Sequence, residues 1–557
     1  MTDNILALLK SFFVFTPNDP IIFTNISFWI FFTAVYAVFT VIYKQYNAKN
    51  LFLFIVSVFF YYKTSGLFFV LLLFTICNEF FLAQAIYHSQ NSAKRKWLLA
   101  LSVFVNMGIL CYFKYAYFFT ESYNQIFHTD NKVFNYFAHW GNSFTDGEPF
   151  RVDKIILPVG ISFYTFQTLS YTIDVFKGRL KPVTNFVDFG FYGTFFPQLV
   201  AGPIVRAKDF IPQIRKPFEL SKYHFGLALF MILNGLFKKM VIGDYIAVNF
   251  IDIIFGNPLL FTGVENLLAV IGYSLQVYLD FSGYTDIAIG ISLLMGYRLN
   301  INFNSPYKAR STAEFWKRWH ISLSTWLQDY LYIPLGGNKK GSIASYIIIT
   351  ILCIFISLML NAMWLLWILG SIAFILLAVS FISPGIKNII NTNINLMITM
   401  LLGGLWHGAT LNFIIWGGLN GIGLIFYKFW KKISPYEKLH SLPVHFWKVF
   451  STFSFITLTR IFFRAEDMNQ ANEVIGKISH DIYWGHLPAI LSHYWREFAL
   501  MALGFIVHWL PSDMKWQYKK FFIKTPVWSK VVIVILTVVL IYQTMSSEMK
   551  PFIYFQF

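Results

Sequence analysis

Two histidines inside apolar stretches are the residues of this chain best suited to chemistry. His320 lies in STAEFWKRWHISLSTWLQDYLYIPLGG, residues 311–337, and His407 lies in GGLWHGAT. An ionisable group is costly in an apolar environment, so in a membrane protein it usually faces a cavity that has a function. Histidine moves protons near neutral pH, and proton transfer is therefore the chemistry that these residues could perform. A hydrogen-bonded core histidine is the alternative that the two residues by themselves leave open.

The segments around both histidines predict how they are positioned. Ser311 and Glu314 form a capping-box pattern, and a proline and two glycines near residue 336 provide a stop, so a single helix of about six turns is expected between them. Four residues of this helix share one stripe at helical spacing: Trp316, His320, Leu323 and Leu327. His320 is therefore expected to face apolar groups. His407 follows an uncharged hydrophobic run, and neighbouring glycines allow a backbone or a ligand to approach closely.

The composition predicts a polytopic membrane protein. Of the 557 residues, 57% are hydrophobic, 20% are aromatic and only 13% are charged. The net charge of +17 is typical of cytoplasmic loops and of contacts with anionic membrane lipids, and no basic module indicates a nucleic-acid partner. The three cysteines lie in apolar runs and predict neither a disulfide framework nor a metal cluster. We expect no removable signal peptide, because the N-terminal segment lacks a cleavage-site pattern.

Hydrophobic runs and the positive charges between them predict the topology. Over five spans within residues 21–176, lysines and arginines gather at alternate ends, which places the N-terminus outside the cytoplasm. Residues 186–205 are apolar but interrupted by glycine and proline, so we expect a re-entrant or broken segment that is buried in protein or lines a wet cavity. Residues 265–279 and 285–295 form two further apolar runs, and residues 343–381 an apolar hairpin. A lysine-rich linker precedes the last span, residues 531–545, so the C-terminal tail is expected to be extracytoplasmic.

Polar side chains recur inside the apolar segments and leave two explanations open. Asp280 and Asp286 are six residues apart in YSLQVYLDFSGYTDIAIG, and ion translocation is one account of them. The other account is that they cap or bridge interrupted helices. The chain contains no G-x-S-x-G, P-loop, H-E-x-x-H or Cys-His metal pattern, so nothing in it supports a serine hydrolase, a nucleotide-binding protein or a zinc site.

Four stretches, taken together, form a pattern that is specific enough to indicate a protein family. They are FPQLVAGPIVR (196–206), YLDFSGYTDIAIG (278–290), NFNSPYKARSTAEFWKRWHISLSTWLQDYLYIPLGG (302–337) and LLGGLWHGATLNFIIWGGLNG (401–421). In wording and order they resemble the bacterial branch of the membrane-bound O-acyltransferase (MBOAT) family, which includes the membrane proteins of alginate O-acetylation, peptidoglycan O-acetylation and teichoic-acid D-alanylation. The resemblance runs from about Leu157 to the C-terminus. The chain departs from the family in the larger separation of its two histidines, and the hairpin at residues 343–381 is the excess.

The resemblance implies an all-α, MBOAT-like helical bundle with re-entrant segments around a central tunnel. We expect one transmembrane acyltransferase domain over residues 1–557. Within it, residues 1–156 are peripheral N-terminal spans, residues 157–427 are the MBOAT core, and residues 428–557 are C-terminal spans with an extracytoplasmic tail. The implied location is the bacterial cytoplasmic (inner) membrane.

The resemblance also assigns roles to residues. His407 of the WHG motif matches the catalytic histidine of the family, and His320 matches its second functional histidine. Burial favours the neutral ring that a base needs before attack, and such a base typically contributes ~10²- to 10⁴-fold. Trp406 would fix the plane of the ring, and Asn412 or a backbone amide near residues 403–404 would donate to the oxyanion. The candidate residues of the substrate tunnel are Trp406, Asn412, Trp316, Arg206, Gln198 and Asp286.

The C-terminal sequence PFIYFQF suggests an acyl acceptor. It resembles the terminal aromatic motif of this branch and of the small partner peptide of the teichoic-acid system, where a tyrosine is thought to take the acyl group. Tyr554 is the matching residue. The hypothesis is that a cytoplasmic thioester reaches His407 through a channel and that Tyr554 receives the acyl group from the opposite face. A tail that only plugs or anchors the last helix is the alternative.

The expected function is export of acyl groups, foremost acetyl, for O-acylation of a cell-envelope polysaccharide. The implied donor is acetyl-CoA or another acyl thioester, and no metal is expected. An extracytoplasmic SGNH-type transferase is the implied partner, since we find no G-D-S-type segment in the chain, and membrane lipids surround it. The alternatives are D-alanyl or other acyl transfer to a different polymer, a lipid or a protein, and an ion-coupled transporter that uses Asp280 and Asp286.

Overall fold

The computed structural model describes residues 13–16, 20–144, 150–199, 202–382, 384–544 and 552–553. Every regular element within these ranges is a helix, which confirms the all-α prediction. Six of these helical segments are long and apolar enough to cross a membrane: Tyr46–His88, Ser92–Phe127, Lys222–Gly256, Gly385–His407, Leu411–Ile433 and Val527–Thr544. Length and apolar composition at this level indicate a polytopic membrane protein.

The helices follow one another in four groups along the chain. The first group is α2 (Ile26–Ile42), α3 (Tyr46–Ser65), α4 (Phe69–His88), α5 (Ser92–Phe127) and α6 (Tyr136–Asn142). The second is α7 (Ile161–Phe176), α8 (Phe186–Thr194), α9 (Phe196–Leu199), α10 (Ala207–Ile214), α11 (Lys222–Leu236), α12 (Asp244–Ile246), α13 (Asp252–Gly256) and α14 (Gly263–Leu294). The third is α15 (Thr312–Arg318), α16 (Ile321–Leu327), α17 (Ile343–Met359), α18 (Met363–Ile382), α19 (Pro384–His407) and α20 (Leu411–Ile433). The fourth is α21 (Leu442–Arg464), α22 (Met468–His480), α23 (Leu487–His493), α24 (Trp495–Trp509), α25 (Ser512–Lys524) and α26 (Val527–Thr544).

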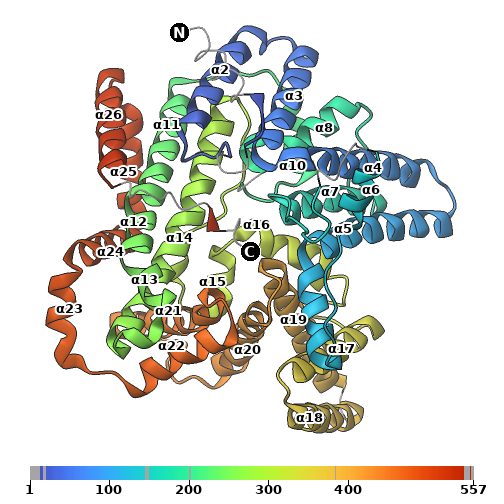
Figure 1. Cartoon of the computed structure of the whole chain (residues 1–557), viewed down its shortest axis with the longest axis vertical. Helices are drawn as coiled ribbons and strands as arrows, with labels where there is room; N and C mark the ends of the chain where they lie inside the picture. Colours follow the sequence, from blue (N-terminus) through green and yellow to red (C-terminus); the bar gives the residue numbers. More distant parts are fainter. Residues whose placement is uncertain are drawn as a thin grey trace.

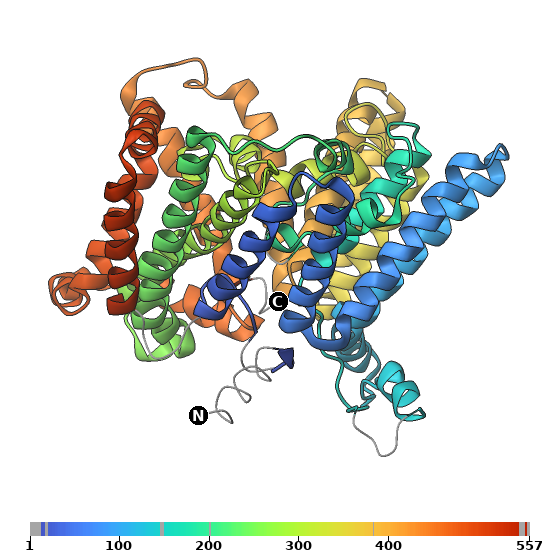
Figure 2. The same ribbon diagram turned by 90° about the horizontal axis from the view of Figure 1, so that it is seen from above.

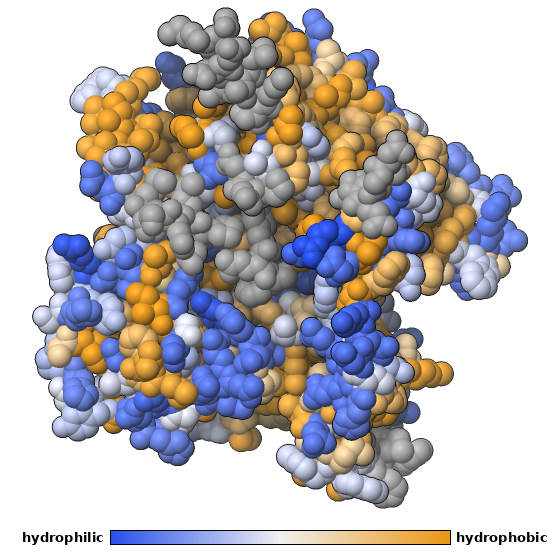
Figure 3. All heavy atoms as spheres, viewed as in Figure 1, coloured by the Kyte–Doolittle hydropathy of each residue, from blue (hydrophilic) through white to orange (hydrophobic). Residues whose placement is uncertain are grey.

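The long helices surround a centre formed by α14, α15 and α16 (Figure 1). Helices α4 and α5 lie at one edge of the molecule and α25 and α26 at the opposite edge, and most long helices run in similar directions (Figure 2). Hydrophobic side chains gather along the outer edges over α26, α2 and α3, whereas hydrophilic ones cover much of the face over α20 and α22 (Figure 3). This distribution fits a bundle whose flanks contact lipid and whose end faces water.

Helix α14 corrects one expectation from the sequence. Residues 265–279 and 285–295 were expected as two apolar runs, but α14 continues through both as one helix of 32 residues. Close packing explains the continuity, because Gly283 of α14 faces Gly235 of α11. A Cβ atom at Gly283 would lie 2.8 Å from the carbonyl oxygen of Gly235, so only glycine permits this approach.

The segment before residue 215 is broken, as its glycines and prolines predict. Helices α8, α9 and α10 are short, and Asn185 caps α8 by accepting hydrogen bonds from the amides of Val187 and Asp188. Gln198 and Arg206 are buried, with 2% and 7% of their surfaces exposed. Gln198 and Arg206 are thus enclosed in protein rather than exposed to lipid.

The segment of residues 311–337 is not the single six-turn helix that its pattern predicts. It divides into α15 and α16 at His320, which has a φ of 43° in the left-handed region, and it ends in a wider π-helical turn over Gln328–Tyr332. The predicted start is confirmed, because the Ser311 hydroxyl oxygen accepts a hydrogen bond from the Glu314 amide at 3.1 Å. The predicted hairpin is also present as α17 and α18, which meet at Asn361, where φ is 49°.

Candidate active site

The two histidines meet in the interior of the bundle. Their ring centroids are 6.2 Å apart. Both residues are buried, with exposed fractions of 0% for His320 and 2% for His407. His320 comes from the break between α15 and α16, and His407 is the last residue of α19. The fold therefore places together two ionisable groups that are distant in sequence.

Asn302 shapes the break that presents His320. Its side-chain oxygen accepts hydrogen bonds from the Ser322 amide at 3.1 Å and the Ser322 hydroxyl at 2.9 Å, and its backbone oxygen accepts from the Ile321 amide at 3.0 Å. The same side-chain oxygen lies 3.3 Å from Nδ1 of His320. Because an amide oxygen can only accept, Nδ1 carries the proton in this contact, and the neutral ring keeps the lone pair on Nε2. Asn302 thus sets both the backbone turn and the tautomer of His320.

Lys114 holds the end of α19 that carries His407. Its ammonium donates to the carbonyl oxygens of Trp406 at 2.7 Å and His407 at 3.1 Å. The neighbouring Tyr115 hydroxyl donates to the carbonyl oxygen of Leu405 at 2.9 Å. The last carbonyls of a helix have no partner within the helix, and a cation there also complements the helix dipole. The sequence analysis did not single out Lys114, although a lysine inside the apolar run CYFKYAYFF was a visible signal.

Aromatic rings surround the imidazole of His407. Trp406, Trp416 and Phe463 lie edge-on to it, with centroid distances of 5.1, 5.1 and 5.4 Å. Trp406 is itself packed against Phe163 at 5.3 Å, which fixes its position beside the histidine. Rings on these sides limit the orientations of the imidazole and leave it accessible through the cavity described next.

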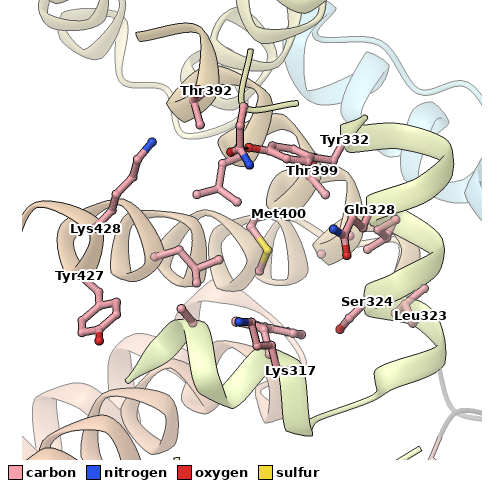
Figure 4. A pocket seen from close by; sticks show the side chains of 18 of the residues that line it. Lys317, Leu323, Ser324, Gln328, Tyr332, Thr392, Thr399, Met400, Tyr427 and Lys428 are labelled. Carbon is pink, nitrogen blue, oxygen red and sulfur yellow. Dashed lines mark hydrogen bonds between the residues drawn. The ribbon is translucent and has the colours of Figure 1, made fainter. Parts of the chain in front are cut away.

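A cavity of about 610 Å³ reaches His407. Its apolar part is lined by Trp316, Leu323, Leu327, Met400, Gly403 and Gly404. Ser324 of α16 and Gln328 of the π-helical turn that follows face Met400 of α19 across this space (Figure 4). The lining also includes four lysines: Lys317, Lys428, Lys431 and Lys432. Three of these lysines are exposed and His407 is buried, so the cavity leads from the surface to the histidine.

Glycines bring α19 and α20 close enough to form this wall. A Cβ atom at Gly404 would lie 2.2 Å from the carbonyl oxygen of Phe413, and one at Gly417 would lie 2.3 Å from that of Met400. The amides of residues 403 and 404 lie inside a helix, where intrahelical bonds engage them. What these glycines supply is close helix contact and a smooth surface rather than donors for an oxyanion.

The structure places several predicted tunnel residues away from the cavity. Of the six candidates, only Trp316 is among the described residues that line it. The Asn412 amide donates to the carbonyl oxygen of Ala465 at 3.0 Å, so it joins α20 to the end of α21. Trp406 packs behind His407. This geometry supports a bridging role for Asn412 in place of the predicted oxyanion contact.

The remaining polar candidates take part in other contacts. Arg206 pairs with Asp329 at 3.2 Å, and the Gln198 amide donates to the carbonyl oxygen of Tyr192 at 2.9 Å. Asp286 pairs with Lys238 at 2.7 Å. These contacts connect helices around the site. Tyr554, the predicted acyl acceptor, lies outside the described residues.

Comparison with known proteins agrees with the motifs. The pattern of the MBOAT, membrane-bound O-acyltransferase family, matches residues 121–383, which include His320 but not His407. Peptidoglycan O-acetyltransferase of Helicobacter pylori is 33% identical over 465 residues, covering 77% of this chain and 75% of that protein. The chain belongs to the MBOAT family. The resemblance predicted from four motifs is thereby confirmed.

Other members of the MBOAT family are similar over shorter regions. Probable alginate O-acetylase AlgI of Pseudomonas putida is 38% identical over 387 residues, which is 69% of this chain and 64% of that protein. Teichoic acid D-alanyltransferase of Bacillus subtilis is 28% identical over 300 residues, 53% of this chain and 64% of that protein. The chain thus spans slightly less than two thirds of the length of the alginate relative that it matches.

Proposed function

We propose that this MBOAT protein transfers acyl groups, foremost acetyl, from a cytoplasmic thioester for O-acylation of a cell-envelope polysaccharide. The observation that carries the proposal is the cavity that leads from exposed lysines to the buried His407. The relatives support acetyl as the group, because those of 38% and 33% identity are named as O-acetylating proteins, whereas the D-alanyl relative is 28% identical. D-alanyl or other acyl transfer is the alternative.

The two ends of the cavity fit the two ends of coenzyme A. A thioester on a long, narrow arm suits the apolar part that ends at His407, and phosphate groups suit the lysines near the surface. Lysines are typical of the cytoplasmic side of membrane proteins, which agrees with a cytoplasmic thioester as the donor. Acetyl-CoA is therefore the proposed donor, bound with its acyl carbon toward the histidine.

The chemistry then needs two proton transfers, to and from the imidazole, and one displacement at the thioester carbonyl. The lone pair of a neutral imidazole accepts the proton of the acceptor hydroxyl while its oxygen attacks the thioester carbonyl. The new ester C–O bond forms, the C–S bond breaks, and the proton passes from the imidazole to the departing thiolate. His407 lines the cavity and is assigned as the base, and His320, held by Asn302, is assigned as its partner.

Tyr554 is the proposed acceptor, on the extracytoplasmic side of an inner-membrane protein. The described residues just before it support this proposal, since Phe552 packs against Phe281, and Phe281 packs edge-on against His320 with centroids 4.7 Å apart. An extracytoplasmic SGNH-type transferase would carry the acyl group from the tyrosine to the polysaccharide. Replacement of Tyr554 by Phe keeps the aromatic ring but removes the hydroxyl, so polymer acylation should stop.

The deciding experiment supplies acetyl-CoA labelled in its acetyl group to inside-out vesicles that contain the protein. An acyltransferase labels its own chain or a partner, and His407→Ala should reduce the labelling rate by roughly 10²- to 10⁴-fold. An ion-coupled transporter would label neither. In the structure both Asp280 and Asp286 are paired with lysines, which favours the transferase. Equal labelling by His407→Ala and the unmodified protein would contradict the proposal.

A further inference from the structure

Residues Phe552 and Ile553 are buried in the centre of the bundle. They are 0% and 6% exposed, although the last described residue before them, Thr544, ends the peripheral helix α26. The short red segment that they form lies beside α14 in Figure 1. Charged and aromatic residues of the neighbouring helices surround this segment.

A buried carboxylate binds the backbone of the segment. The Ile553 amide donates to Oδ2 of Asp280 at 3.1 Å, and Oδ1 of the same carboxylate pairs with the Lys239 ammonium at 2.5 Å. Lys239 also pairs with Asp244 at 2.6 Å. Both oxygens of Asp280 are thus engaged, one by a cation and one by the tail. Hydrogen bonds to a charged acceptor are stronger than neutral ones, and more so where water is excluded.

The local backbone is built to bring this pair together. Lys239 lies in the π-helical turn Phe237–Gly243, a rare element that is frequent at functional sites. A Cβ atom at Gly283 would lie 3.2 Å from Cβ of Lys239, so the glycine lets the lysine approach α14 within one turn of Asp280. The π-helical turn and Gly283 therefore both favour the contact between Lys239 and Asp280.

Two aromatic rings of α14 hold Phe552 near the histidines. Its ring packs against Tyr284 at 4.6 Å and Phe281 at 5.4 Å between centroids. Phe281 in turn contacts His320, yet neither Phe281 nor Phe552 is among the described residues that line the cavity reaching His407. The tail and the cavity thus approach the histidine pair from different sides.

We propose that the Lys239–Asp280 pair, with the ring of Phe281, is a docking site for the C-terminal segment of the same chain. Asp280 is a positioning residue: it holds the amide of residue 553, directly before Tyr554, the proposed acceptor, in the sequence. Docking itself is independent of the proposed acylation, and only the role of Tyr554 rests on the proposed function.

Hydrogen exchange of the C-terminal peptide tests the docking directly, in the full-length protein in detergent or nanodiscs. In Asp280→Asn, the Lys239 ammonium keeps its ion pair with Asp244. It also attracts the oxygen of the new side-chain amide at position 280, so the NH₂ group of that amide turns toward the Ile553 N–H. Two donors then face each other, so exchange at residue 553 should accelerate about tenfold to a hundredfold. Ile553→Pro, which removes the donor and leaves the ion pair intact, should release the tail to a similar extent, seen as faster exchange of its remaining amides.

Two matched controls should leave the tail protected. Asp286→Asn changes the other carboxylate of α14, which pairs with Lys238, and Ile553→Val keeps the amide donor. Binding of acetyl-CoA should be unchanged in all four variants, because the cavity is lined by none of these residues. Unchanged tail exchange in Asp280→Asn would overturn the docking site. If the tail is released in these variants but acyl transfer stays complete, the docking site is confirmed. The proposed role of Tyr554 as acyl acceptor is then refuted.

Discussion

At the scale of single residues, the least expected contributor is Lys114. It donates to two carbonyl oxygens at the end of α19 and so fixes the backbone of His407. Lys114→Met keeps the length of the side chain and removes the charge. We expect a loss of about 1–2 kcal/mol in the free energy of unfolding and slower acyl transfer. Lys114→Arg keeps a donor, so it should retain more of the stability and more of the transfer rate than Lys114→Met. Thermal unfolding in detergent and labelling from acetyl-CoA measure the two.

The residue scale also shows what the sequence could reveal of the site. His320 and His407 were identified because ionisable residues in apolar runs are rare and because their motifs resemble the family. Asn302 and Lys114 were not assigned roles, since their importance depends on partners that only folding brings close. The contact of Lys114 with Trp406 joins residues 292 positions apart. Asn412 was misplaced for the converse reason, because proximity in sequence to His407 did not imply a place in the cavity.

At the scale of elements, the contact between α19 and α20 controls the shape of the cavity. Gly417 and Gly418 are adjacent in α20 and form a matched pair. A Cβ atom at Gly417 would lie 2.3 Å from the Met400 carbonyl oxygen, whereas one at Gly418 would lie 3.2 Å from the flexible tip of Leu401. Gly417→Ala should therefore push the helices apart, cost about 1–3 kcal/mol and reduce acyl transfer.

Gly418→Ala is the internal control for this effect. Alanine is favoured over glycine in a helix by ~1 kcal/mol, so this variant should be as stable as the unmodified protein or slightly more so. Thermal unfolding and acetyl transfer of both variants decide the matter. Equal destabilisation by the two substitutions would show that helix contact at Gly417 does not set the cavity.

Helix boundaries were predictable where local sequence determines them and not where tertiary contacts override it. The Ser311 cap and the hairpin of α17 and α18 follow from local patterns. The break at His320 does not, because Asn302, from a separate segment, supplies the acceptors that replace helical bonds. Conversely, α14 passes through a stretch that looks like a break, since α11 packs against Gly283.

At the scale of the whole molecule, the histidine pair is approached from two sides. On one side a cavity leads from exposed lysines to His407, and on the other side Phe552 packs against Phe281, which covers His320. Such an arrangement lets a donor and an acceptor reach one base without sharing a path. This separation of paths agrees with the proposed transfer across a bilayer.

The lysines of the cavity give the last prediction, which concerns the charge of one face of the molecule. Reversing Lys431 and Lys432 to Glu should raise the KM for acetyl-CoA about tenfold through lost attraction for phosphate, with kcat unchanged at saturating donor. The difference should shrink as salt is added, because exposed charges are screened within ~10 Å at 0.1 M ionic strength. Reversing Lys519 and Lys520 of α25, which do not line the cavity, alters the net charge equally and should leave KM unchanged. If both pairs of substitutions raised KM alike, general surface charge rather than the cavity would attract the donor.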